Sequence, residues 1–212
     1  MSFSERELWL EQRKKGIGGS DASAVMGLNP YKSNIELWEE KLGIVEPEDI
    51  SNKDCVVYGN HAEEPLRQLF ALDHPQYEVT HKEFKVYQHK EYPFLQASLD
   101  GLLKDQDGRV GILEIKTTEI LRSMQSESWK DQIPNNYYIQ VLHYMNVMNA
   151  DFAVLKAQLK YNYSDSELKT VCRHYHIERS EVEEDIKILQ EAEVKFWTNN
   201  VQRQIRPNKI IF

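Results

Sequence analysis

The spacing of apolar residues predicts helices in the first third of the chain and again after residue 134. Apolar positions that recur every three or four residues form one face of a helix, and Ser, Asp or Gly residues mark its ends. We expect Ser33 and Ser180 to cap two helices, and Ser20 or Asp21 to cap a third. The predicted helices cover residues 4–14, the stretch after the glycine loop (residues 16–19), and residues 33–42, 56–74, 135–150 and 180–200.

Short runs in which apolar and polar residues alternate begin at residue 77, and this period of two is typical of strands. Residues 119–132 are polar and fit neither period. The predicted order along the chain is helices, a β-meander, one helix, two strands and a last helix. This order predicts an α+β fold around a mixed sheet. The 212 residues suit a single domain, 1–212. The predicted strands cover residues 77–88, 94–103, 110–117, 152–161 and 168–178.

Composition narrows the class of protein. A hydrophobic content of 41% fits a globular chain. No stretch approaches the roughly 18 apolar residues of a membrane span, and the charged N-terminus lacks the apolar core of a signal peptide. Cys55 and Cys172 are too few and too far apart for a zinc ribbon, and they fit a reducing cytosol. A net charge of −8 repels nucleic acid, so a DNA-binding role requires a local basic lining or bound metal ions.

The stretch SLDGLLKDQDGRVGILEIKTT places charged residues where strands bury apolar ones. Glu114 and Lys116 share a face because alternate strand residues point the same way, and Asp100 ends the preceding strand. Two converging carboxylates repel each other unless a cation lies between them, and Mg²⁺ prefers such oxygen ligands. Lys116 can orient a metal-bound water or neutralise a phosphoryl oxygen, so the set suits metal-assisted phosphodiester hydrolysis. The same spacing also arises by chance, as edge-strand acids beside a solvated lysine.

The turn between the two strands decides whether the carboxylates meet. A two-residue turn at Asp107 and Gly108 pairs Asp100 with Ile115, on the face away from Glu114. A three-residue loop, 106–108, with Gly108 in the left-handed conformation pairs Asp100 with Glu114 instead. The proposed chemistry therefore requires the three-residue loop or a bulge.

Five stretches between residues 13 and 148 occur in an order typical of one nuclease family: RKKGIGGSDASAVMGLNPY, GNHAEEPLRQLF, ASLDGLL, GILEIKTT and YYIQVLHYMNVM. They resemble the YqaJ-type viral recombinases, relatives of phage lambda exonuclease in the PD-(D/E)xK nuclease superfamily. The resemblance implies an α/β restriction-endonuclease-like core, with a mixed central β-sheet flanked by helices. It also implies that Asp100 and Glu114 bind metal, with the backbone carbonyl of Ile115 as a further ligand, and that Lys116 is the catalytic lysine.

The same resemblance assigns roles on two helices. Glu63 matches the acid of a G-N-x-x-E motif that approaches the metal site. Its neighbour Glu64 stays an alternative, because adjacent helix residues diverge by about 100° and only one can face the site. Gln140 and Tyr144 match a Q-x-x-x-Y motif, and their spacing of four residues puts both on one helix face.

Residues on either side of the glycine loop match the positions that bind a terminal 5′-phosphate in this family. The resemblance assigns this role to Arg13 and Ser20. A planar guanidinium suits a phosphate, and the backbone amides near Gly19 at the start of the following helix add an anion site.

The function implied by the resemblance is a Mg²⁺-dependent 5′→3′ exonuclease that acts on double-stranded DNA ends. Mn²⁺ is expected to substitute for Mg²⁺. The product would be a 3′ single-stranded overhang for recombination by annealing. The resemblance also implies that the protein forms a ring-shaped homotrimer around DNA and has a single-strand annealing protein as partner. Two alternatives stay open: a structure-specific or restriction-like endonuclease, and a non-catalytic DNA-end-binding module on the same fold. The intact set of Asp100, Glu114 and Lys116 argues against the module.

Overall fold

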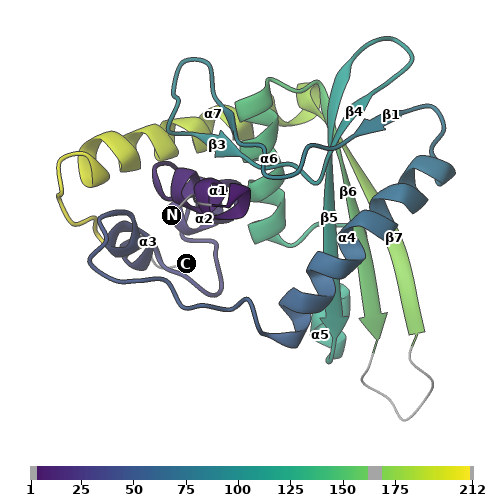
Figure 1. The fold of residues 1–212 in the computed structure, drawn as a ribbon, viewed down its shortest axis with the longest axis horizontal. Coiled ribbons are helices and arrows are strands. Elements are labelled where there is room, and N and C mark those ends of the chain that lie inside the picture. Colours follow the sequence, from purple (N-terminus) through teal and green to yellow (C-terminus); the bar gives the residue numbers. More distant parts are fainter. Residues whose placement is uncertain (1–3, 162–168, 211–212) are drawn as a thin grey trace.

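The centre of the molecule is a five-stranded mixed sheet flanked by helices, in a computed structural model that describes residues 4–161 and 169–210 (Figure 1). The strand order is β1-β4-β5-β6-β7; β5 and β6 run parallel and the other neighbours are antiparallel. A separate pair, β2 with β3, is antiparallel. Leu168, the first residue of the last predicted strand, lies outside the described residues. The strands are β1 (Glu78–Thr80), β2 (Tyr87–Gln88), β3 (Gln96–Ala97), β4 (Gly101–Lys104), β5 (Val110–Ile120), β6 (Phe152–Tyr161) and β7 (Lys169–Glu178).

The β4–β5 hairpin has the register that the chemistry requires. Gly101 pairs with Leu113, so Asp100, one residue earlier, lies across from Glu114. The amide of Asp105 donates to the carbonyl of Arg109 at 3.1 Å, which closes a three-residue loop. Gly108 in that loop has a φ of 83°, a left-handed conformation that glycine adopts without steric cost. Of the alternatives that the sequence left open, the structure has the three-residue loop.

Helices cover both faces of the sheet. On one face, α4 packs through Leu66 and Phe70 against Leu113 of β5. On the other, α6 packs through Val141 and neighbouring residues against Ile112. Figure 1 shows α1, α2 and α3 gathered on the α6 side. The helices are α1 (Glu5–Lys14), α2 (Gly19–Val25), α3 (Asn34–Lys41), α4 (Asp54–Asp73), α5 (Ser123–Glu127), α6 (Asn135–Met148) and α7 (Arg179–Lys195), which continues into a π-helical turn, η1 (Phe196–Val201).

Two predicted helix caps are wrong. Gly18, not Ser20 or Asp21, is the N-cap of α2; its amide donates to the Asp21 carboxylate at 3.1 Å, which places Ser20 inside the first turn. The N-cap of α7 is Glu178 instead of Ser180, because β7 runs into the helix without a loop. Ser33 caps α3 as predicted. No helix in the described ranges is both long and apolar enough to cross a membrane.

Candidate active site

Glu114 is the centre of a buried polar cluster on the α6 face of the sheet. Its side chain is 2% exposed, and its Oε1 atom accepts from Lys116 Nζ at 2.6 Å and from Gln140 Nε2 at 2.8 Å. The other oxygen, Oε2, is buried and has no hydrogen-bond partner in the described structure. An unsatisfied buried carboxylate oxygen costs free energy, and a further ligand bound to it would offset that cost.

Asp100 joins the cluster from the position directly before β4. Its Oδ2 atom accepts a 2.7 Å hydrogen bond from the amide of Ile115, which fixes the carboxylate beside the β5 backbone. The Ile115 side chain points the other way and packs in the apolar cluster under α4. The alternation along β5 therefore separates the charged face from the apolar face, as the sequence predicts.

The charges of the cluster shift each other's proton affinity. Burial, followed by the charges of Glu114 and Glu63, raises the pKa of Asp100 well above its usual range. Burial also raises the pKa of Glu114, against the opposing effect of Lys116. Burial disfavours the Lys116 ammonium, yet Glu114 and Asp100 together raise the pKa of that amine. A positive ion would relieve the repulsion among the carboxylates.

Glu63, rather than Glu64, lies on the side of α4 that faces the cluster. Arg67 Nη1 donates to Glu63 Oε1 at 2.9 Å and to the backbone carbonyl of Asp100 at 2.7 Å. Glu64 is exposed and accepts from Gln68. Sequence reasoning missed Arg67, although its position four residues after Glu63 is the spacing of a helix ion pair.

Gln140 and Tyr144 line the α6 side of the cluster. Gln140 Nε2 also donates to the Tyr144 hydroxyl at 3.1 Å, so the amide bridges that hydroxyl and Glu114. The Tyr144 ring packs on Gly19, where a Cβ atom would lie 2.5 Å from ring carbon Cε1. Only a glycine allows this approach, which brings the start of α2 against the cluster.

Arg13 lies at the end of α1, and Ser20 follows Gly19, which packs on Tyr144 of the cluster. The Arg13 guanidinium lies 4.4 Å from the centre of the Trp9 ring. Trp9 Nε1 donates to Ser98 at 3.0 Å, two residues before Asp100. Ser20 is exposed on the first turn of α2. The phosphate-binding role of these two residues stays a prediction.

The cluster fits a hard divalent cation with few protein ligands. Among the described residues, no three His, Cys, Asp or Glu side chains form a group that could hold a metal ion by themselves. Mg²⁺ typically takes one or two carboxylates and completes its coordination with water and phosphate oxygens. Two carboxylates, one with a buried oxygen that lacks a partner, suit this requirement.

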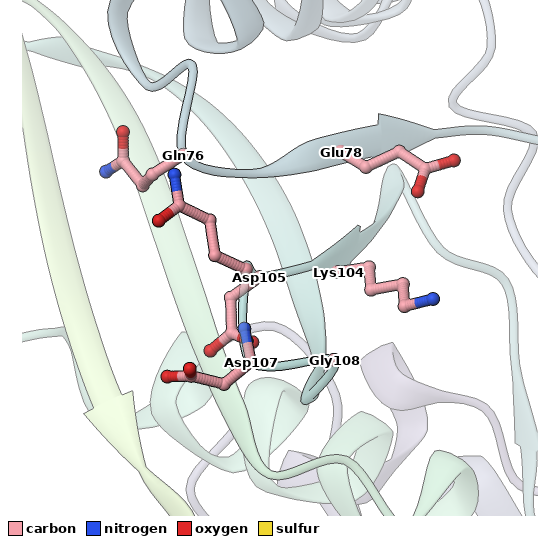
Figure 2. A pocket seen from close by; sticks show the side chains of 7 residues that line it. Gln76, Glu78, Lys104, Asp105, Asp107 and Gly108 are labelled. Carbon is pink, nitrogen blue, oxygen red and sulfur yellow. The ribbon is translucent and has the colours of Figure 1, made fainter.

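A second acidic region lies at the other end of β4, along the hairpin turn (Figure 2). It is an open hollow of about 470 Å³ whose acids include Glu78, Asp105 and Asp107. Arg109 Nε already donates to Asp105 Oδ2 at 2.8 Å. No predicted site residue lines this hollow, whose walls are Gln76, Glu78, Lys104, Asp105, Gln106, Asp107 and Gly108.

Two solved exonuclease structures share the fold of this chain. The alkaline exonuclease LHK-Exo from Laribacter hongkongensis aligns with a TM-score of 0.59 and 17% identity over 93% of this chain and 97% of that one. A phage-related exonuclease from Haemophilus somnus 129PT aligns with a TM-score of 0.56 and 14% identity over 89% and 96% of the two chains. The fold is therefore the restriction-endonuclease-like fold of these exonucleases, which confirms the predicted fold class.

Residues 8–151 match the YqaJ-like viral recombinase domain, and the chain belongs to this family. The uncharacterized protein YqaJ of Bacillus subtilis strain 168 is 34% identical over 206 residues. The alignment covers 94% of this chain and 58% of that protein, so the chain spans little more than half the length of this relative. The resemblance predicted from the sequence motifs is confirmed.

Proposed function

We propose that this protein is a Mg²⁺-dependent exonuclease that degrades double-stranded DNA ends in the 5′→3′ direction and leaves 3′ single-stranded overhangs. The observation that carries the proposal is the state of Glu114: Lys116 and Gln140 hold one carboxylate oxygen, and the other is buried without a partner beside Asp100. Membership in a viral recombinase family and the fold of two exonucleases support the same activity.

Asp100, Glu114 and the backbone carbonyl of Ile115 would hold the divalent cation. When bound, Mg²⁺ supplies Lewis acidity toward a phosphoryl oxygen and lowers the pKa of a coordinated water, and Mn²⁺ is expected to do the same. The hydrogen bond from the Ile115 amide fixes the Asp100 carboxylate for this role. Arg67 holds Glu63 next to these ligands, where its carboxylate can accept a hydrogen bond from solvent or substrate.

Lys116 and Gln140 both donate to Glu114, but they have different roles. Lys116 keeps its proton next to Glu114, so it presents a fixed positive charge to a phosphate that enters the site. Such a charge stabilises the transition state more than the ground state when negative charge develops on the phosphoryl oxygens. Gln140 keeps the Glu114 carboxylate in place, and Tyr144 keeps Gln140 in place.

Arg13, Ser20 and the amide of Gly19 would bind the terminal 5′-phosphate. Arg13 makes no ion pair in the described part of the chain, so its guanidinium is available to an anion. Since the chain has a net charge of −8, such local contacts must offset repulsion from DNA. By family resemblance we also propose a ring-shaped homotrimer and a single-strand annealing protein as partner.

The test is degradation of linear duplexes labelled at either end, with a 5′-phosphate or a 5′-hydroxyl, with Mg²⁺ and with a chelator. We expect loss of the 5′ label first and only with the metal. A hydrogen bond from Arg to a phosphate contributes about 1.5–3 kcal/mol, so the 5′-phosphate duplex should react roughly ten- to a hundredfold faster. Arg13→Ala should remove that preference while metal-dependent cleavage continues.

Closed circular duplex is the matched control substrate. Cleavage of circles would favour an endonuclease, and a mobility shift without any cleavage would favour a DNA-end-binding module. Equal rates on both ends, or loss of the 3′ label first, would contradict the 5′→3′ assignment.

A further inference from the structure

A second buried polar cluster lies behind the candidate active site and joins three elements. His143 of α6 is fully buried, with Nδ1 2.6 Å from Glu193 Oε1 of α7 and Nε2 2.8 Å from the backbone carbonyl of Gln96 in β3. Glu193 is also fully buried. The active-site chemistry described above uses neither side chain, so their burial requires another explanation.

Both partners of the His143 ring are acceptors. A backbone carbonyl never donates, so Nε2 must carry a proton, and a carboxylate opposite Nδ1 requires a second proton between the two groups. Histidine binds that proton more tightly than glutamate, with ordinary pKa values of about 6.5 and 4.3, respectively. Burial disfavours the charged ring, yet Glu193 and then Gln96 raise the pKa of His143. The geometry therefore favours an imidazolium–carboxylate pair.

Other charged groups near the ring act in the same direction or are compensated. From α2, Asp21 favours the imidazolium, although Lys41 of α3 already pairs with that carboxylate at 2.7 Å. His89, which follows β2, lies within electrostatic range of both His143 and Glu193, and burial lowers the pKa of its own imidazole. The lowered pKa of His89 weakens the repulsion between its ring and a charged His143.

We propose that His143 is a positively charged positioning residue for the catalytic cluster. It precedes Tyr144 directly and follows Gln140 by three residues, so it lies on the helix segment that supports Glu114. The Gln96 amide donates to the carbonyl of Ile17 at 2.8 Å, so the same contact reaches the glycine loop. The imidazolium thus fixes α6 against α7, β3 and the loop that contacts Tyr144.

The charge of His143 can be measured without a cleavage assay. In protein with ¹⁵N-labelled histidine, we expect NMR to show two protonated ring nitrogens for His143 at neutral pH. Glu193→Gln should convert His143 to a neutral ring protonated on Nε2 and should shift the side-chain amide resonances of Gln140. A neutral His143 ring in the parent protein would overturn the proposal, because the proton would then reside on Glu193.

The catalytic readout rests on the proposed nuclease function. Misplacing a catalytic group by a fraction of an ångström to one ångström can cost up to about a hundredfold in rate. Glu193→Gln should therefore lower kcat by about ten- to a hundredfold and leave KM for DNA nearly unchanged. His176→Gln, an exposed histidine of β7, is the matched control and should keep the parental kcat.

A third variant distinguishes a positioning role of the His143–Glu193 pair from a purely structural one. If Glu193→Gln fails to fold, His143→Leu combined with Glu193→Leu removes both charges, a change that cores often tolerate. A folded double variant with shifted Gln140 amide resonances supports the positioning role. Parental Gln140 resonances and kcat in either folded variant would overturn it. A parent protein without nuclease activity would contradict the proposed function and leave the two NMR results to decide this inference.

Discussion

The two faces of the β5–β6 strand pair both bury ionisable groups, but in different ways. On the α6 face, Glu114 lies across from Leu155 and is held by Lys116 and Gln140. On the α4 face, Lys156 lies across from Ile115, fully buried. Its Nζ atom has no hydrogen-bond partner in the described structure and lies 5.8 Å from the centre of the Phe70 ring.

Both faces bury charged groups, but only on the α6 face do several charged groups meet. On the α6 face, several charges of both signs meet, and one carboxylate oxygen is left for a further ligand. On the α4 face, burial lowers the pKa of a single amine, and its neighbour His174 shows a lowered pKa for the same reason. Burial makes the charged form of a solitary amine less stable, whereas converging carboxylates require a cation. We therefore expect catalysis on one face and only a stability cost on the other.

The largest expected effect follows loss of a carboxylate on the α6 face. Asp100→Ala or Glu114→Ala should lower the cleavage rate by more than about a thousandfold, because a metal ion contributes several kcal/mol to such reactions. Mg²⁺ should raise the Tm of the parent and have little effect on either variant. Full cleavage by Asp100→Ala would contradict the metal-site assignment.

Lys116→Ala should have the next largest effect. A fixed charge beside the reacting phosphate contributes mainly to the transition state, so kcat should fall by about a hundred- to a thousandfold. The Mg²⁺-dependent rise in Tm should persist, because Asp100 and Glu114 remain. Steady-state kinetics and thermal melts measure the two properties separately, and an unchanged kcat would exclude Lys116 from the chemistry.

On the α4 face, Lys156→Met should stabilise the protein and leave cleavage intact. An unsatisfied buried polar group costs about 1–3 kcal/mol, and methionine matches the length of the lysine stem. Because the folded-state pKa of Lys156 is lowered, the ionised amine destabilises the fold below its unfolded pKa. The gain should therefore be present at neutral pH and shrink above about pH 10. Urea unfolding at neutral pH and above about pH 10 measures the gain in stability. A loss of cleavage activity in Lys156→Met would show that a solitary buried charge also contributes to catalysis.

The smallest expected effect is a pH-dependent stability change at Asp100. Its raised pKa means that the fold favours the protonated carboxyl, so ionisation destabilises the metal-free protein above that pKa. Asp100→Asn keeps an oxygen for the Ile115 amide and should stabilise the metal-free protein by about 1 kcal/mol at alkaline pH. The difference should shrink as the pH falls toward the ordinary aspartate value of about 3.9. A gain that grows with acidification would have the wrong sign.

Local sequence rules predicted the parts of the site that depend on strand period, and they left two turn lengths open. The alternation of Glu114, Ile115 and Lys116 follows from the period of a strand, and the pairing of Asp100 with Glu114 follows from a three-residue loop. The spacing of Gln140 and Tyr144 likewise predicted a shared helix face, and the two side chains are hydrogen-bonded.

Contacts between distant segments could not be predicted in this way. Arg67 reaches the carbonyl of Asp100, 33 residues along the chain, and His143 meets Glu193, 50 residues along, only because the sheet and α6 bring these elements together. A backbone carbonyl also carries no side-chain signal, so its use as an acceptor cannot be read from residue types. The cap at Glu178 was missed because no polar loop separates β7 from α7.

The most direct test of the central claim is the position of a divalent cation. Crystals grown with Mn²⁺ can be measured at the manganese absorption edge, where an anomalous difference peak locates the ion independently of catalysis. We expect a peak beside Asp100 and the buried Oε2 atom of Glu114, and we expect this peak to be lost in Glu114→Gln. A peak at the acidic hairpin hollow formed by Glu78, Asp105 and Asp107 instead, with the Glu114–Asp100 cluster empty, would contradict it.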